Sequence, residues 1–278
     1  SKSLINKQIE IVAPNGAQGW IFSALGQLRK QSKLTNQSLL VVSSGKEAEE
    51  LVAFLRLVDP ETEVLEFVSW ETLPHERLSP SAETVGKRLE TIHRLADLSK
   101  TDQPFTVVCS IRAALQPVIL GLDKYPPLSF KVGEEYLLPE LSLKLIEIAY
   151  QRVDMVTRRG EFALRGGILD IFPTTARHPV RLEFFGDELE QMREFSVADQ
   201  RSLDLKPTEL TLYPAREIII TPQVAARARE MEHEFPNLST MLAKIGQGIP
   251  VDGMESLAPV LVESLGQISD YLPDSANV

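Results

Sequence analysis

Residues 9–28 read "IEIVAPNGAQGWIFSALGQL": an apolar run, a turn at Gly16 and an apolar helix, which is the layout of a phosphate-binding loop. A working loop, G-x-x-x-x-G-K-[ST], needs glycines for close backbone approach, a lysine for the β and γ phosphates, and a hydroxyl for magnesium. Aligned with that pattern, the four key positions carry Ala13, Gln18, Gly19 and Trp20. None of these residues can do the required chemistry, so the sequence predicts a degenerate loop that keeps the fold without nucleotide hydrolysis.

Segment 151–181 is rich in arginine and has a net charge of +3, within a chain whose net charge is -10. Its arginines are Arg152, Arg158, Arg159, Arg165, Arg177 and Arg181. Guanidinium groups make bidentate contacts with carboxylates, and arginines with exposed aromatic rings often anchor protein interfaces. The segment therefore predicts a protein-binding surface, with a solvated arginine-rich face as the alternative.

The stretch "PVRLEFF" alternates as a strand does. Residues Val180, Leu182 and Phe184 share one face, and Arg181, Glu183 and Phe185 share the other. Because the first set satisfies a core face without Phe185, we expect Arg181 and Phe185 to point outward, toward the same partner.

Other reactive constellations are missing from the sequence. The histidines, His75, His93, His178 and His233, do not have metal-ligand spacing, and Cys109 lies in the apolar run "FTVVCS". We therefore expect no catalytic residue, metal or cofactor. The negative net charge also disfavours direct binding to a nucleic-acid backbone, although a local basic patch could outweigh the mean.

Along the chain that holds these residues, short apolar runs alternate with segments of helical periodicity. Buried strands are predicted at "IEIVA" (9–13), "LLVV" (39–42), "VLEFV" (64–68) and "FTVVCS" (105–110). Helices are predicted after Ser44, which forms a capping box with Glu47, and after the stretch "LSPSAE". This alternation indicates an α/β fold with a parallel sheet covered on both faces.

The prolines of "GLDKYPPLSF" interrupt that rhythm, so we divide the chain into three parts. Residues 1–126 are the first part of a nucleotide-binding-like domain, 127–213 an inserted α+β domain, and 214–278 the second part of the first domain. The closing "DYLPDSANV" resembles the approach to an unfinished strand, so we expect a truncated longer protein. The single cysteine and the lack of an apolar span or secretory signal predict a cytoplasmic protein with no membrane contact.

The run "YQRVDMVTRRGEFALRGGILDIFPTTARHPVRLEFFGDELEQMREFSVADQRS" (150–202) is similar to a module shared by the transcription-repair coupling factors (Mfd) and the excision-repair protein UvrB. The similarity begins at "WETLPHERLSPSAETVGKRLETI" (70–92) and continues through "LYPAREI" (212–218) and "GMESL" (253–257). UvrB has an intact phosphate loop, and a tyrosine-rich stretch where this chain has "WETLP". The chain is therefore identified as a member of the coupling-factor family.

The resemblance implies a degenerate RecA/helicase-like domain whose inserted domain binds UvrA, the damage-recognition ATPase, in transcription-coupled nucleotide excision repair. Carried over by position, the UvrA-binding residues are Arg165, Arg181 and Phe185. It also implies an ATP-dependent DNA translocase motor beyond residue 278, a C-terminal domain that masks the UvrA site, and contacts with RNA polymerase and DNA through other domains. Ala149 departs from the family, which often has glycine there, and affects only a local turn.

Two alternatives remain at this stage. An ATPase module with an altered loop would bind ATP and magnesium in a titration. A UvrB-like module that binds damaged DNA directly would give a gel shift whose affinity falls steeply with salt.

Overall fold

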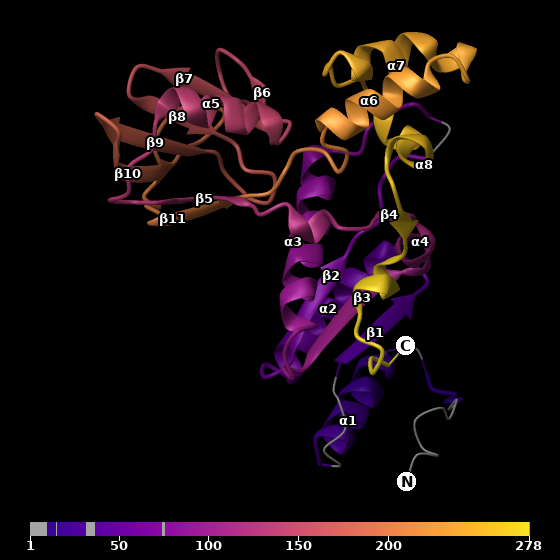
Figure 1. Cartoon of the computed structure of the whole chain (residues 1–278). Helices are drawn as coiled ribbons and strands as arrows, with labels where there is room; N and C mark the ends of the chain where they lie inside the picture. Colours follow the sequence, from indigo (N-terminus) through magenta and orange to yellow (C-terminus); the bar gives the residue numbers. More distant parts are fainter. Residues whose placement is uncertain (1–9, 15, 32–36, 74–75, 278) are drawn as a thin grey trace.

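The computed structural model describes residues 10–14, 16–31, 37–73 and 76–277. Its first lobe contains a parallel sheet of three strands in the order β1-β3-β2 (Figure 1). Its elements are α1 (Gln18–Gln31), β1 (Gln37–Val42), α2 (Gly45–Val58), β2 (Glu63–Phe67), α3 (Ala82–Leu98), β3 (Phe105–Ser110), α4 (Ile111–Leu115), β4 (Val118–Ile119) and the 3-10 turn η2 (Leu122–Lys124). The predicted strands at 39–42, 64–68 and 105–110 are confirmed to within a few residues.

Helices cover both faces of this sheet, as predicted. Helix α3 packs on one face through a side that includes Val85 and Ile92, both fully buried. Helix α2 covers the other face, and the Ser44 hydroxyl accepts a hydrogen bond from the Glu47 amide at its start. The central strand β3 is buried along its whole length, and burial raises the pKa of Cys109 to about 11, so this thiol stays protonated near neutral pH.

The two edges of the parallel sheet differ. Side chains cap the outer carbonyls of β2: Arg56 donates to Val64 and Thr91 donates to Glu66. At the edge of β1, the backbone of Asn277 bonds the Leu39 amide and the Gln37 carbonyl, at 2.7 and 2.9 Å. Asn277 thus forms a parallel bridge beside β1, in agreement with the expected approach to a strand.

A separate domain holds a mixed sheet of five strands in the order β10-β9-β8-β7-β6 (Figure 1). Its elements are β5 (Leu128–Lys131), α5 (Leu138–Glu147), β6 (Gln151–Arg152), β7 (Glu161–Arg165), β8 (Ile168–Ile171), β9 (Val180–Phe185), β10 (Glu188–Glu194) and β11 (Glu209–Leu212). Strands β7 to β10 are antiparallel, as expected, whereas the short β6 runs parallel to β7. The first and last strands, β5 and β11, pair with each other, so the chain enters and leaves this domain at one place.

The remaining elements are α6 (Pro222–Met231), η3 (Pro236–Leu238), α7 (Ser239–Gly246), η4 (Met254–Leu257), α8 (Ala258–Leu261), β12 (Leu265–Gly266) and η5 (Ile268–Tyr271). The helices α6, α7 and α8 surround a small core of their own. The helical part of residues 254–268 ends at Leu261, because the chain then extends to pair β12 with β4. From there it returns to the first lobe, where Ile268 joins the core beside α3 (Figure 1).

Candidate functional site

One face of the mixed sheet carries the predicted site residues. The opposite face packs against α5 and contains Phe162, Leu169, Val180 and Leu182, all at most 2% exposed. Cross-strand partners share a face, so the pairs Asp170↔Arg181 and Arg181↔Arg193 place these three side chains in one row on the outer face. A neighbouring row on that face contains Arg165, Ile168, Glu183 and Gln191. We call this side of β7 to β10 the outer face.

Two glycine turns bring Arg165 and Phe185 to the same end of the outer face. Arg165 is the last residue of β7 and Phe185 the last of β9, and each is followed by a glycine with positive φ, Gly166 or Gly186. Between them, Gly167 accepts a hydrogen bond from the Phe184 amide, and a Cβ on Gly167 would lie 2.8 Å from the Phe184 carbonyl oxygen. Only glycine permits this close approach of the two strand ends.

Phe185 is 76% exposed, although it is a large apolar ring, and the side chain of Arg165 is 59% exposed. The predicted alternation of residues 180–185 is therefore confirmed, since Val180 and Leu182 are buried and Phe185 points outward. Exposed aromatic and arginine side chains that share one face of a sheet are of the types that often anchor protein interfaces.

Arg181 lies on the outer face, as predicted, but its guanidinium is largely engaged within the domain. Its side chain is 22% exposed, and its Nε and Nη2 donate to the two carboxylate oxygens of Asp170 at 2.6 and 2.9 Å. The guanidinium also stacks over the Phe195 ring, 5.0 Å from its centre. The hydrogen bonds to Asp170 raise the pKa of Arg181, which keeps it charged.

Two charged residues of the outer face, Asp170 and Arg193, were not predicted from the sequence. Asp170 is 1% exposed and bridges Arg165 and Arg181. Arg193 lies beyond the arginine-rich segment and donates to the side-chain carbonyl of Gln191. A bulge between Leu189 and Gln191 interrupts the alternation in β10, so sequence spacing alone did not assign Arg193 to this face.

The altered phosphate loop has no strand before it in the described residues. The strand expected at 9–13 is wrong for residues 10–13, which form no strand with any described part of the chain, and Val12 is 94% exposed. A strand needs a neighbour for its backbone hydrogen bonds, and β1 pairs instead with β3 on one side and Asn277 on the other. The turn at Gly16 has a φ of 90° and leads into α1, which begins at Gln18.

Gly19 and Trp20, at the positions of the missing lysine and hydroxyl, contact helix α2. A Cβ on Gly19 would lie 2.5 Å from the Phe54 ring, and the Trp20 ring meets that same ring edge to face at 5.0 Å between centres. Beside them, Gln18 and Glu47 line a hollow of about 460 Å³, in which the Glu47 carboxylate binds the Ser43 amide and hydroxyl. The contacts of Gly19 and Trp20 with Phe54 serve helix packing. The Glu47 carboxylate gives the neighbouring hollow a negative charge.

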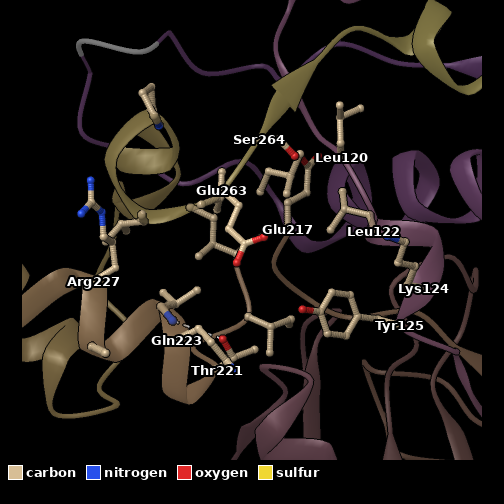
Figure 2. Close-up of a pocket in the computed structure, with 18 of the residues that line it drawn as sticks. Leu120, Leu122, Lys124, Tyr125, Glu217, Thr221, Gln223, Arg227, Glu263 and Ser264 are labelled. Carbon is tan, nitrogen blue, oxygen red and sulfur yellow. Dashed lines mark hydrogen bonds between the residues drawn. The ribbon is translucent and has the colours of Figure 1, made fainter.

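A second hollow, of about 850 Å³, lies between the end of the first lobe and α6. Figure 2 shows Lys124 and Tyr125 on one side of it and Gln223 and Arg227 on the other. Arg227 is already bonded to Glu230 and to the Val260 carbonyl. Charges of both signs and apolar side chains are mixed here, and among the described lining residues no nucleophile is hydrogen-bonded to a base.

Within the described ranges no group of three or more His, Cys, Asp or Glu side chains could hold a metal ion. His93 lies against Tyr213 with the two rings tilted by 45°, and burial lowers its pKa, so it is neutral near pH 7. Across the same part of the chain, no helix has both the length and the apolar character needed to cross a bilayer.

Comparison with known proteins defines the class of this site. The family model described as "UvrB interaction domain" matches residues 128–218, which include the mixed sheet and its outer face. The chain thus contains a UvrB interaction domain.

The relatives extend over nearly the whole chain. It is 44% identical to the transcription-repair-coupling factors of Mycobacterium bovis and Mycobacterium tuberculosis over 98% of its length, which is 22% of theirs. It is 34% identical to that of Bacillus subtilis over 70% of this chain and 16% of the relative. The chain belongs to the transcription-repair-coupling factor family, and it spans about a fifth of the length of the mycobacterial relatives.

Proposed function

We propose that this chain is a non-catalytic adaptor module that recruits UvrA to a transcription-repair coupling factor. Its contact surface, the docking patch, consists of Arg165, Arg181 and Phe185 on the outer face. The observation that carries the proposal is the 76% exposed Phe185, which lies at the same end of the outer face as the exposed Arg165 side chain, within a matched UvrB interaction domain. The positive charge of the patch implies carboxylates on the surface of the partner.

The contribution of the docking patch is tested by alanine substitution and measurement of UvrA binding by biolayer interferometry. We expect Arg165→Ala, Arg181→Ala and Phe185→Ala each to weaken binding by about 2 kcal/mol, because hot-spot residues of this type contribute about that much. Circular dichroism verifies that each variant is folded, since Arg181 also binds Asp170.

Two matched variants control for the loss of an exposed side chain. Arg201→Ala removes an 84% exposed arginine of the same domain, and Leu143→Ala removes a 63% exposed apolar side chain from α5, on the opposite side of the sheet. Both should bind UvrA as the unchanged protein does. If the three patch variants also bind normally while folded, the docking patch is wrongly assigned.

We also propose that the chain has no ATPase activity of its own. The contacts of Gly19 and Trp20 with Phe54 support this, since a lysine at position 19 would meet the ring of α2, and no cation is among the described residues that line the hollow beside Glu47. Isothermal titration with ATP and magnesium should give no binding heat at micromolar concentrations. The double substitution Gly19→Lys and Trp20→Ser should not create binding, and it should lower stability by about 1–3 kcal/mol through overpacking against Phe54. Micromolar ATP binding by the unchanged chain would revive the ATPase alternative.

The proposed domain boundaries, 127 and 213, are supported by the pairing of β5 with β11, which closes the inserted domain at its base.

For the longer protein we propose, from the family resemblance, that a C-terminal domain masks the docking patch. Other domains would translocate along DNA and would contact RNA polymerase and DNA. The isolated chain should therefore bind UvrA without a nucleotide of its own.

A further inference from the structure

Asp170 lies between two residues of the docking patch but cannot touch a partner itself. Its side chain is 1% exposed, and its carboxylate accepts hydrogen bonds from both Arg165 and Arg181. The three donors are Nη2 of Arg165 at 3.0 Å and Nε and Nη2 of Arg181 at 2.6 and 2.9 Å. Asp170 is thus a buried anion whose charge is compensated by the two patch arginines.

The strand register fixes this arrangement. Asp170 is directly opposite Arg181 across β8 and β9, and Arg165 follows Ala163, the partner of Asp170 in β7, by two residues on the same face. The Phe195 ring supports the guanidinium of Arg181. Both arginines therefore converge on one carboxylate from neighbouring strands.

The hydrogen bonds leave part of each guanidinium available. Nε and Nη1 of Arg165 and Nη1 of Arg181 have no acceptor among the described residues. One carboxylate against two guanidinium groups leaves a net positive charge. A carboxylate of a partner could take these remaining donors while Asp170 keeps both groups in place.

We propose that Asp170 is the positioning residue of the docking patch: it holds Arg165 and Arg181 in the orientation that an acidic surface of the partner recognises. The proposal rests on the proposed function of the patch. Long arginine side chains lose rotamer freedom when they bind, and a side chain already held by Asp170 loses less. Removal of Asp170 therefore weakens partner binding although no partner contact is lost.

Charge alone predicts the opposite result. Asp170→Asn makes the patch more positive by one charge, which would strengthen the attraction to acidic groups on the partner. The sign of the change in affinity thus separates positioning from simple electrostatic attraction. Asparagine also keeps the size of the side chain and one acceptor oxygen, which limits disturbance of the sheet.

The experiment measures the dissociation rate of the whole chain from immobilised UvrA, because this rate reports only on folded molecules that have bound. We expect Asp170→Asn to dissociate at least about tenfold faster than the unchanged chain. Asp199→Asn is the matched control, since Asp199 pairs with Arg201 on the surface of the same domain and should leave the rate unchanged. Asp170→Asn should accelerate dissociation less in the Arg181→Ala background than in the unchanged chain, because one of the two arginines that Asp170 holds is then absent.

A second measurement does not need the partner. In NMR spectra of the unbound chain, the Arg181 Nε proton should exchange slowly with water, and Asp170→Asn should accelerate this exchange about tenfold or more as the hydrogen bond to the carboxylate weakens. Unchanged exchange would overturn the positioning role whatever the binding result.

The binding outcomes are distinguishable. If the unchanged chain does not bind UvrA, the proposed function fails, and the positioning role fails with it. If the unchanged chain binds while Asp170→Asn dissociates at the same rate or more slowly, the positioning role alone is wrong.

Discussion

At the scale of single residues, Ala149 occupies a backbone position whose geometry favours glycine. Its φ is 65°, in the left-handed region, directly after helix α5. The Ala149 amide bonds the Ile146 carbonyl and the Tyr150 amide bonds the Leu145 carbonyl, which is the Schellman arrangement that ends a helix. Glycine is favoured at this position because it has no Cβ, and the chain has alanine.

Ala149→Gly should therefore stabilise the protein. The left-handed conformation costs alanine about 1–2 kcal/mol, and the greater freedom of glycine in the unfolded chain offsets about 0.4–1 kcal/mol of that gain. We expect a net increase of about 0.5–1 kcal/mol in the free energy of unfolding, measured by urea denaturation. As a control, Ala163→Gly, in strand β7, should destabilise the protein, since Ala163 is buried and has strand geometry. A lower stability of Ala149→Gly would contradict this reading of the helix end.

At the scale of elements, the periodicity of the sequence predicted which faces of a strand and of a helix are buried, because these faces depend on local geometry along the chain. The alternation of residues 180–185 assigned the outward face of β9, and the periodicity after "LSPSAE" assigned the buried side of α3, with Val85 and Ile92 fully buried. Both follow from local geometry, because side chains alternate in a strand and recur every three to four residues in a helix.

What depends on pairing between elements could not be predicted in this way. The apolar run at 9–13 has the composition of a strand, but residues 10–13 have no neighbouring strand in the part of the chain that the structure describes. Nothing in the sequence distinguishes Asp170 from the other acidic residues of segment 151–181. Only the register of β7, β8 and β9 shows that it binds Arg165 and Arg181. The sequence therefore predicted Arg165, Arg181 and Phe185 as members of the candidate site, and it did not predict the buried Asp170.

At the scale of the whole molecule, a buried ion pair joins segments far apart in the chain. Arg88 of α3 donates through Nε to the Glu217 carboxylate at 2.5 Å, and both side chains are fully buried. Trp70 donates to the same oxygen, and the Arg88 guanidinium lies over the Phe67 ring. Since Glu217 follows the mixed-sheet domain, this cluster connects the first lobe to the segment that leaves that domain.

The cluster predicts a difference between breaking the pair and replacing it. Glu217→Leu alone leaves the Arg88 charge buried without a carboxylate, and it should cost about 3–5 kcal/mol in the free energy of unfolding. The double variant Arg88→Met with Glu217→Leu should recover most of this loss, because Nη2 of Arg88 and Oε2 of Glu217 already lack hydrogen-bond partners among the described residues. Denaturant unfolding followed by tryptophan fluorescence measures both variants, and Trp70 reports directly on the cluster.

A surface pair, Arg94 with Glu63, is the control, since Glu63→Gln should change stability by less than about 1 kcal/mol. If the double variant is as unstable as Glu217→Leu, Arg88 and Glu217 contribute through their separate packing and not through the ion pair that joins the two segments.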